Sequence, residues 1–298
     1  MKAQNKFCRM VPATLVQKYF GLTGANREDL IEWSYWNQYD TFHNHPFDLL
    51  SPEMSKQVID RHNETSKKLG DYITMLIAKR FLAVKLEKWT FSTIVRLKDD
   101  VVTRMLRTSL SKELDFDIKR LGVNAGGLLI GAIETTSQAV AQILQYLFQH
   151  PQWLSAAVTA ARKEDATEFD GIVWEALRFV PISSYLFRLT DSDYTIAKGT
   201  NYATIVRAGT YVLPVTQSAM FDERAFETPD EFIPQRNWYH YFHFGFGDHE
   251  CLGRYVGMVM IPEMVRQVLL RKDIEPQGAM DYKSGPFPES YTLAWPAP

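Results

Sequence analysis

The stretch from residue 121 to residue 150 constrains the fold most, because it contains no proline and is followed directly by Pro151. A helix of roughly thirty residues is about 45 Å long, which is enough to cross a whole domain. Proline removes a backbone donor and clashes with the preceding turn, so the helix should end at that position. We therefore predict one long helix over residues 121–150 at the centre of a mainly helical fold.

The middle of this predicted helix carries an acid and an alcohol within an apolar run. Residues 131–136 read Gly-Ala-Ile-Glu-Thr-Thr. A carboxylate buried there is costly unless it is paired or functional. The Thr135 hydroxyl can donate to the carbonyl of Gly131, one turn back, and loosen the helix. The alternative is a helix kinked by its glycines, with Glu134 on the surface.

A single cysteine between glycines is the second unusual feature. Residues 244–253 read Phe-Gly-Phe-Gly-Asp-His-Glu-Cys-Leu-Gly and precede an apolar helical pattern over residues 255–270. A helix N-terminus stabilises a thiolate, which is the form of cysteine that binds a metal. We expect Gly247 and Gly253 to allow close turns where a Cβ atom would clash. The alternative is a buried structural cysteine in a glycine-rich turn.

A charged pair, Glu175 and Arg178, is the third feature. Residues three apart lie on one face of a helix, so the two side chains can form a fork that accepts another charged group. Taken alone, such a pair is usually a solvated salt bridge worth a few tenths of a kcal/mol.

The remaining patterns predict further helices and small antiparallel β-sheets. A mixed aromatic segment over residues 35–50 is expected to be a loop, in which His43 and His45 are either ordinary loop histidines or a metal-binding pair. Asp115 or Asp117 should cap the helix that follows. The other predicted elements are helices over residues 10–21 (closed by Gly21), 52–80 and 99–110, a small antiparallel sheet over 193–214, a kink at Pro262, and a last strand near 291–295.

Composition limits the function classes. The chain has 298 residues, of which 46% are hydrophobic, so it can bury a large core, and its net charge of −2 argues against nucleic acid as a partner. Cys8 and Cys251 are the only two cysteines and no apolar leader is visible, which predicts a reducing, cytoplasmic setting. The longest apolar run, residues 126–133, is far shorter than the ~20 residues that span a bilayer. We predict a single domain over residues 1–298.

The cysteine loop resembles the haem-binding loop of the cytochromes P450, and the other motifs follow in the order of that family. The resemblance implies that Cys251 is the thiolate ligand of the iron of haem b, and that its loop residues Phe244, Gly245 and Gly253 contact the cofactor. Arg188 and His249 match positions that pair with the haem propionates.

The other two motifs resemble P450 signatures as well. Residues 131–136 are similar to the oxygen-binding groove, which implies that Glu134 is the acid and Thr135 the alcohol that help deliver protons to dioxygen. The family usually has glycine where this chain has Ala132, so we expect a narrower groove beside the cofactor. Glu175 and Arg178 resemble the Glu-x-x-Arg motif, whose third partner would be Arg236, as a structural brace.

The resemblance implies an oxidoreductase with a P450-like helical fold. The expected activity is a haem-thiolate monooxygenase that hydroxylates a small apolar, lipid-like or terpenoid-like substrate, with electrons from a ferredoxin-like or flavoprotein donor. The chain is shorter than is usual in the family and lacks N-terminal elements, namely the first strands, an early substrate loop and a propionate-binding helix. The expectation is either a truncated or split P450, or a second polypeptide that completes the pocket.

Other interpretations remain open at this point. Residues 240–245 and the closing Pro-Phe-Pro segment bear a weaker likeness to P450 domains that follow a haem peroxidase in oxylipin-forming fusion enzymes. That likeness implies a fatty-acid hydroperoxide isomerase that needs no external electrons, although Glu134 and Thr135 favour dioxygen activation. A non-catalytic haem-binding module and a helical domain without a cofactor are the remaining alternatives.

Overall fold

The computed structural model describes residues 6–89, 97–110, 114–238, 241–283 and 285–296. The chain divides into two compact units. Unit 1 comprises Met1–Ala141 and Arg271–Pro298, and unit 2 comprises Gln142–Leu270. The fold is mainly helical with small antiparallel sheets, as predicted from the sequence.

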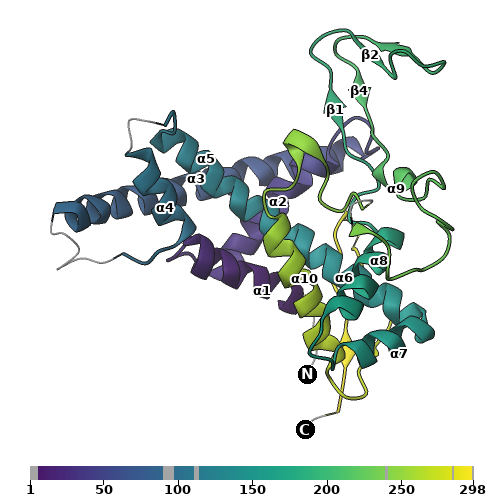
Figure 1. Cartoon of the computed structure of the whole chain (residues 1–298). Coiled ribbons are helices and arrows are strands. Elements are labelled where there is room, and N and C mark those ends of the chain that lie inside the picture. The colour runs from purple at the N-terminus through teal and green to yellow at the C-terminus, as the bar shows by residue number, and fades with distance from the viewer. Residues whose placement is uncertain (1–5, 90–96, 111–113, 239–240, 284, 297–298) are drawn as a thin grey trace. The chain divides into compact units, whose positions relative to one another are not determined.

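Unit 1 is a group of helices in which the long helix α3 packs against α2 and α5 (Figure 1). Its core consists of buried aliphatic and aromatic side chains that return at helical spacing, among them Leu30, Leu106, Leu121 and Leu129. The helical elements of this unit are α1 (Lys6–Leu15), the π-helical turn η1 (Val16–Phe20), α2 (Arg27–His43), α3 (Pro52–Trp89), α4 (Val101–Ser109), α5 (Ile118–Ala132) and the start of α6 (Glu134–Gln149).

Several local predictions in unit 1 are confirmed. The side chains of Asp100 and Asp117 accept backbone hydrogen bonds at the starts of α4 and α5, so Asp117, not Asp115, is the cap. Gly21 ends the first helical segment at φ 91°, and a Cβ atom there would lie 2.3 Å from the Asp100 carboxylate. Two boundaries were wrong, because α2 continues through the predicted loop to His43 and α3 continues beyond residue 80 to Trp89.

The single long helix predicted over residues 121–150 is wrong, because the structure breaks it at Ile133 between α5 and α6. The Thr135 hydroxyl donates to the Gly131 carbonyl at 2.6 Å, so the side chain competes for the acceptor that the helix would use at this point. The regular ladder resumes where the Ser137 N–H donates to the Ile133 carbonyl at 2.9 Å. The predicted end is confirmed, since α6 stops at Gln149 and Pro151 opens the next helix.

Unit 2 is organised around helix α8, which contacts α7 and α10. The Arg266 side chain on α10 donates to the carbonyls of Ala161 and Lys163, which caps the end of α7. Pro262 lies inside α10, which continues on both sides of it, and the kink expected there stays a prediction. The helical elements are the remainder of α6, α7 (Pro151–Ala160), α8 (Thr167–Phe179), α9 (Thr216–Ala219), the 3-10 turn η3 (Gly247–His249) and α10 (Arg254–Leu269).

The sheets are small and antiparallel. In unit 2, β1 (Arg188–Leu189) pairs with β4 (Tyr211–Val212), and β2 (Tyr194–Ile196) pairs with β3 (Thr204–Val206), which confirms the sheet predicted over residues 193–214 (Figure 1). In unit 1, β5 (Glu275–Pro276) pairs with β6 (Leu293–Ala294), so the predicted last strand is present.

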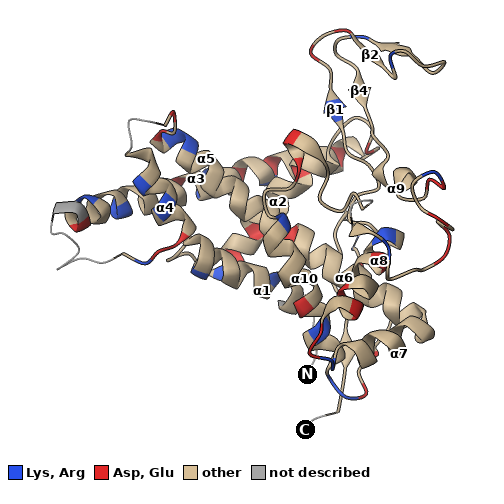
Figure 2. Ribbon diagram, viewed as in Figure 1, with Lys and Arg blue, Asp and Glu red and all other residues tan. Residues whose placement is uncertain are grey.

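Acidic and basic residues are interspersed along α3 (Figure 2). None of the described helices is long and apolar enough to cross a membrane.

Candidate functional site

The loop that carries Cys251 is held by backbone hydrogen bonds just before helix α10. The Cys251 N–H donates to the Phe244 carbonyl at 2.7 Å, and the Arg254 N–H donates to the Cys251 carbonyl at 3.1 Å. These two bonds fold the loop back on itself and place the cysteine one turn ahead of the helix. Its thiol is exposed, so the interpretation as a buried structural cysteine is wrong.

Close packing fixes this loop against α8 and α10. The Phe244 ring contacts Trp174 of α8 with a centroid distance of 5.8 Å. A Cβ atom on Gly257 of α10 would lie 2.9 Å from the same ring, so the helix can approach the loop only because this residue is glycine. Gly245 has a positive φ of 71°, whereas a Cβ atom on Gly253 would be in ordinary contact, 3.7 Å from the Cys251 sulfur. A Cβ atom on Gly247 would meet no atom within 4 Å, so the clashes predicted for Gly247 and Gly253 are both wrong, although Gly247 does adopt a positive φ of 69°.

The surroundings of Cys251 fit a large apolar cofactor. The neighbouring side chains of Phe246 and Leu252 are 71% and 86% exposed, an unusual state for large apolar groups beside a free thiol. Arg188 on β1 and His249 at the end of η3 are also exposed. A haem requires a ligand for its iron, apolar surface for its ring and partners for its propionates. The thiol, the apolar side chains, and Arg188 with His249 match these three requirements.

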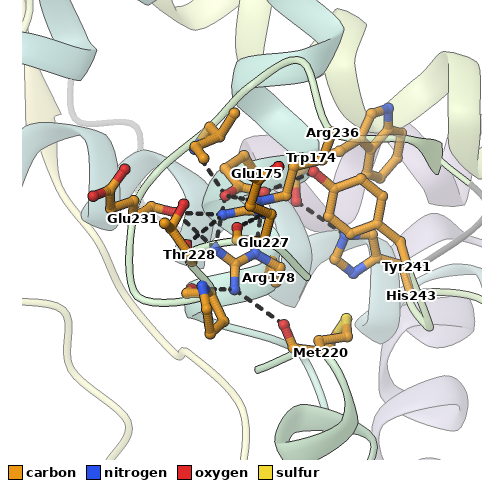
Figure 3. A network of polar contacts seen from close by, with 12 residues as sticks. Trp174, Glu175, Arg178, Met220, Glu227, Thr228, Glu231, Arg236, Tyr241 and His243 are labelled. Carbon is orange, nitrogen blue, oxygen red and sulfur yellow. Dashed lines mark hydrogen bonds and ion pairs between the residues drawn. The ribbon is translucent and has the colours of Figure 1, made fainter. Parts of the chain in front are cut away.

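A buried ionic cluster around Glu175 lies in the same unit (Figure 3). Arg178 makes two parallel hydrogen bonds to the Glu175 carboxylate, Nη2 to Oε1 at 2.7 Å and Nε to Oε2 at 3.1 Å. Arg236 Nε donates to Oε1 at 3.1 Å and the Tyr241 hydroxyl donates to Oε2 at 2.7 Å. The structure thus brings together the three charged residues predicted as a brace, and their interpretation as a solvated pair is wrong.

The charges of this cluster are balanced by its surroundings. Burial raises the pKa of Glu175, but the hydrogen bonds from Arg178, Tyr241 and the Ile233 N–H outweigh it, and the net pKa lies below the ordinary value. The remaining guanidinium hydrogens of Arg178 reach the backbone carbonyls of Met220, Pro229 and Glu231. Glu175 is therefore an ionised scaffold residue.

His243 extends this cluster toward the cysteine loop and was not predicted as a functional residue. Its ring stacks on Tyr241 at 4.8 Å, and Nε2 donates to the Trp174 carbonyl at 2.9 Å because a carbonyl can only accept. Nδ1 is then unprotonated and is buried without a hydrogen-bond partner. Burial lowers the pKa of His243 to about 4.

The acid Glu134 and the alcohol Thr135 lie in unit 1, at the start of α6. The Glu134 side chain is 1% exposed, so its alternative placement on the surface is wrong. Arg9 Nε on α1 donates to Glu134 Oε2 at 2.9 Å, and Arg9 Nη1 donates to Glu289 Oε2 at 3.1 Å. Burial raises the pKa of Glu134 to about 7, against the opposing charge of Arg9.

The predicted site residues are divided between the two units. Ala132 ends α5 and is partly buried, one residue from the break at Ile133. Ala132, Glu134 and Thr135 belong to unit 1, while Cys251 and its predicted companions belong to unit 2. Arg9 and Glu289 were missed by the sequence reasoning, because no local pattern connects them with Glu134.

A hollow between α3 and α5 lies in unit 1. Its volume is about 1100 Å³, and its lining is mostly apolar, including Ile73, Phe81 and Ile130. Ile130 and the lining glycines at positions 126 and 127 belong to α5, the helix that leads into residues 131–136. The same unit therefore offers an apolar space along α5, the helix that precedes the acid and the alcohol of α6.

The histidine pair near residue 44 does not assemble a metal site. His43 is the last residue of α2 and packs edge-on against Phe287 at 5.1 Å. His45 Nε2 instead lies 2.8 Å from the Thr41 carbonyl. Within the described ranges, no three His, Cys, Asp or Glu side chains converge as metal ligands do.

The sequence of this chain is similar to those of curated enzymes. The chain is 32% identical over 144 residues to the steroid C26-monooxygenase of Mycolicibacterium smegmatis, a match that covers 48% of this chain and 33% of that enzyme. It is 27% identical over 243 residues to the cyclomarin C epoxidase CymV of Salinispora arenicola, covering 82% of this chain and 53% of that enzyme. The chain thus spans between a third and about half of the length of these relatives.

Solved structures show the same fold. The chain superposes on P450BioI, solved in complex with an acyl carrier protein ligated to hexadec-9Z-enoic acid, with a TM-score of 0.76 at 19% identity, covering 99% of this chain and 69% of that one. CYP109E1 from Bacillus megaterium, solved with testosterone, gives a TM-score of 0.75 at 18% identity and coverage of 98% and 70%. The family model described as "Cytochrome P450" matches residues 4–289. The chain therefore belongs to the cytochrome P450 family.

Proposed function

We propose that this chain acts as a haem-thiolate monooxygenase that hydroxylates a small apolar substrate. The observation that carries the proposal is the exposed Cys251 thiol, held one turn before α10 and flanked by exposed apolar side chains. When bound, haem b supplies an iron at which dioxygen is activated, and a thiolate ligand favours O–O cleavage.

The residues of unit 2 would hold the cofactor. Cys251 would bind as the thiolate, and the loop residues Phe244, Gly245 and Gly253 would contact the cofactor. Arg188 and His249 are exposed, so they are free to pair with the propionates by charge-assisted hydrogen bonds. The ion cluster of Glu175 would brace this surface and would take no part in proton transfer.

The residues of unit 1 would move protons. Hydroxylation consumes one dioxygen, two electrons and two protons, and yields the alcohol and one water. Glu134 has a pKa of about 7, so its carboxyl can both give and take a proton at neutral pH. Thr135 has its hydroxyl turned back to the Gly131 carbonyl at 2.6 Å, where its oxygen can still accept a hydrogen bond.

The substrate class follows from the apolar hollow beside α5 and from the named relatives. The hollow is lined mostly by aliphatic and aromatic side chains. One of these relatives and two of the solved neighbours have names or titles that refer to a steroid or a fatty acid, and both of these compound classes are largely apolar. We propose a lipid-like or terpenoid-like substrate and a ferredoxin-like or flavoprotein electron donor in the cytoplasm.

The test is the carbon monoxide difference spectrum of the reduced, purified chain after haem loading. We expect the shifted absorption band of a thiolate-ligated haem in the wild type and its loss in Cys251→Ser. Cys8→Ser is the matched control, since it removes the chain's other cysteine. A wild type that binds no haem, or whose band survives Cys251→Ser, would refute the proposal.

Turnover separates monooxygenation from isomerisation. We expect hydroxylated product only with dioxygen and an electron donor. Product formed from a fatty-acid hydroperoxide without any electron donor would contradict a monooxygenase and favour the hydroperoxide isomerase.

A further inference from the structure

Glu134 is paired on only one of its two oxygens. Oε2 accepts from Arg9 Nε at 2.9 Å, whereas Oε1 is buried and has no hydrogen-bond partner. A buried carboxylate oxygen without a donor carries a large desolvation cost, which protonation of the carboxyl removes. The unpaired atom is therefore the natural place for a proton.

Among the described residues, Arg9 is the cation that pairs with Glu134, and it is shared with a second carboxylate. The Arg9 guanidinium uses Nε for Glu134, and Nη1 and Nη2 for the two oxygens of Glu289 at 3.1 and 3.4 Å. The exposed fractions of the Arg9 and Glu289 side chains are only 12% and 20%. With all three groups charged, the cluster carries one excess negative charge in a mostly buried place, which favours the uptake of one proton.

In the part of the chain that the structure describes, the other titratable groups at this cluster are Tyr35 and Cys8, and both are neutral at physiological pH. The Tyr35 ring on α2 lies under the Arg9 guanidinium at 5.3 Å, and its hydroxyl hydrogen-bonds to Glu289. Burial raises the pKa of Tyr35. Burial also raises the pKa of Cys8, the neighbour of Arg9 on α1, to about 12. Neither group supplies a charge, so among the described residues Arg9 opposes the charge on Glu134, and Glu289 competes for the same guanidinium.

We propose that Arg9 and Glu289 are positioning residues that set the proton affinity of Glu134. Arg9 orients the carboxyl and lowers its affinity for a proton, and Glu289 raises it again by engaging the same guanidinium. This inference deepens the proposed function, because it concerns the proton donor of that reaction. It assigns a role to the C-terminal segment, from which Glu289 reaches a residue at the start of α6.

The experiment is a pH titration of protonated carboxyl groups by infrared spectroscopy on the full chain, with Glu134→Gln to assign the band. We expect a midpoint near pH 7 in the wild type. Glu289→Gln should lower it by about one pH unit, because the guanidinium then serves Glu134 alone. Arg9→Gln should raise it, and Arg9→Lys, which keeps the charge, should bring it back toward the wild-type value.

Arg61→Gln is the control, because Arg61 also pairs with two carboxylates in unit 1, those of Glu32 and Glu64, but on more exposed side chains. An unchanged midpoint in Glu289→Gln, or an equal shift in Arg61→Gln, would overturn the inference. Glu289→Gln decides the matter even where Arg9 variants fail to fold. The titration needs no haem, so its failure is distinct from a failure of the carbon monoxide test.

Discussion

The replacement Glu175→Gln tests whether the buried cluster of unit 2 braces the cysteine loop. Glutamine keeps the shape of the side chain but removes its charge and turns one acceptor oxygen into a donor. Arg178, whose side chain has no exposed surface, then loses the carboxylate that balances its charge. The carbonyls of Met220, Pro229 and Glu231 still accept from its guanidinium, but they carry no net charge.

The magnitude follows from the cost of leaving one member of a buried ion pair unpaired, which is about 3–5 kcal/mol. The neutral carbonyl acceptors around Arg178 place the expected loss of unfolding free energy toward the lower end, at about 3 kcal/mol. For a chain of this size, each kcal/mol corresponds to a change in Tm of about 2–4 °C, so we expect Tm to fall by about 6–12 °C.

The assay is urea and thermal unfolding followed by circular dichroism and tryptophan fluorescence. Glu168→Gln is the matched control, because Glu168 lies on the same helix and pairs with Lys163 at side chains about half exposed. An exposed pair of this kind is worth roughly 0–1 kcal/mol. If Glu175→Gln were no more destabilising than Glu168→Gln, the cluster would not be a brace.

Three further predictions concern packing and titration. Gly171→Ala should destabilise the chain by about 1–3 kcal/mol, because its Cβ atom would lie 2.3 Å from the Pro234 carbonyl oxygen. Gly127→Ala should stabilise the chain by up to about 1 kcal/mol, because a Cβ atom there meets open space and alanine favours a helix over glycine. Urea unfolding of both variants checks the two signs. The raised pKa of Glu134 stabilises the fold by about 3 kcal/mol below pH 4.5, and this contribution should be lost as pH rises through 7. The difference in unfolding free energy between wild type and Glu134→Gln should therefore change between pH 4.5 and 7. The lowered pKa of His243 acts in the opposite direction. Its contribution to the unfolding free energy, up to about 3 kcal/mol, is present above pH 6.5 and is lost as pH falls toward 4. A His243→Phe variant whose unfolding free energy depends on pH as in the wild type would contradict this prediction.

Features set by neighbouring residues were accessible from the sequence. The caps at Asp100 and Asp117, the terminus at Gly21 and the start of α7 at Pro151 each depend on one side chain and the adjacent backbone. The cysteine loop was recognised by its resemblance to a family motif, which is contained within ten residues. These are the features that a linear pattern specifies physically.

The break at Ile133 shows where local reasoning was incomplete. The bond from Thr135 to the Gly131 carbonyl was predicted, and it is present at 2.6 Å. Its effect was underestimated, because a competing side chain in a glycine-containing segment of low helix propensity interrupts the helix, where only a loosening was expected. The outcome depends on the balance of small energies, which the pattern alone does not give.

The two buried glutamates show what the sequence could not specify. Glu175 lies beside two guanidinium groups and a tyrosine hydroxyl, and its pKa is lowered. Glu134 shares the one guanidinium of Arg9 with Glu289, and its pKa is raised to about 7. The residue type is the same, and burial opposes ionisation in both, so the number of cations decides which carboxyl is a permanent anion and which exchanges a proton. That number is set for Glu134 by partners 125 and 155 positions away in the chain, at Arg9 and Glu289, which only the folded structure brings together.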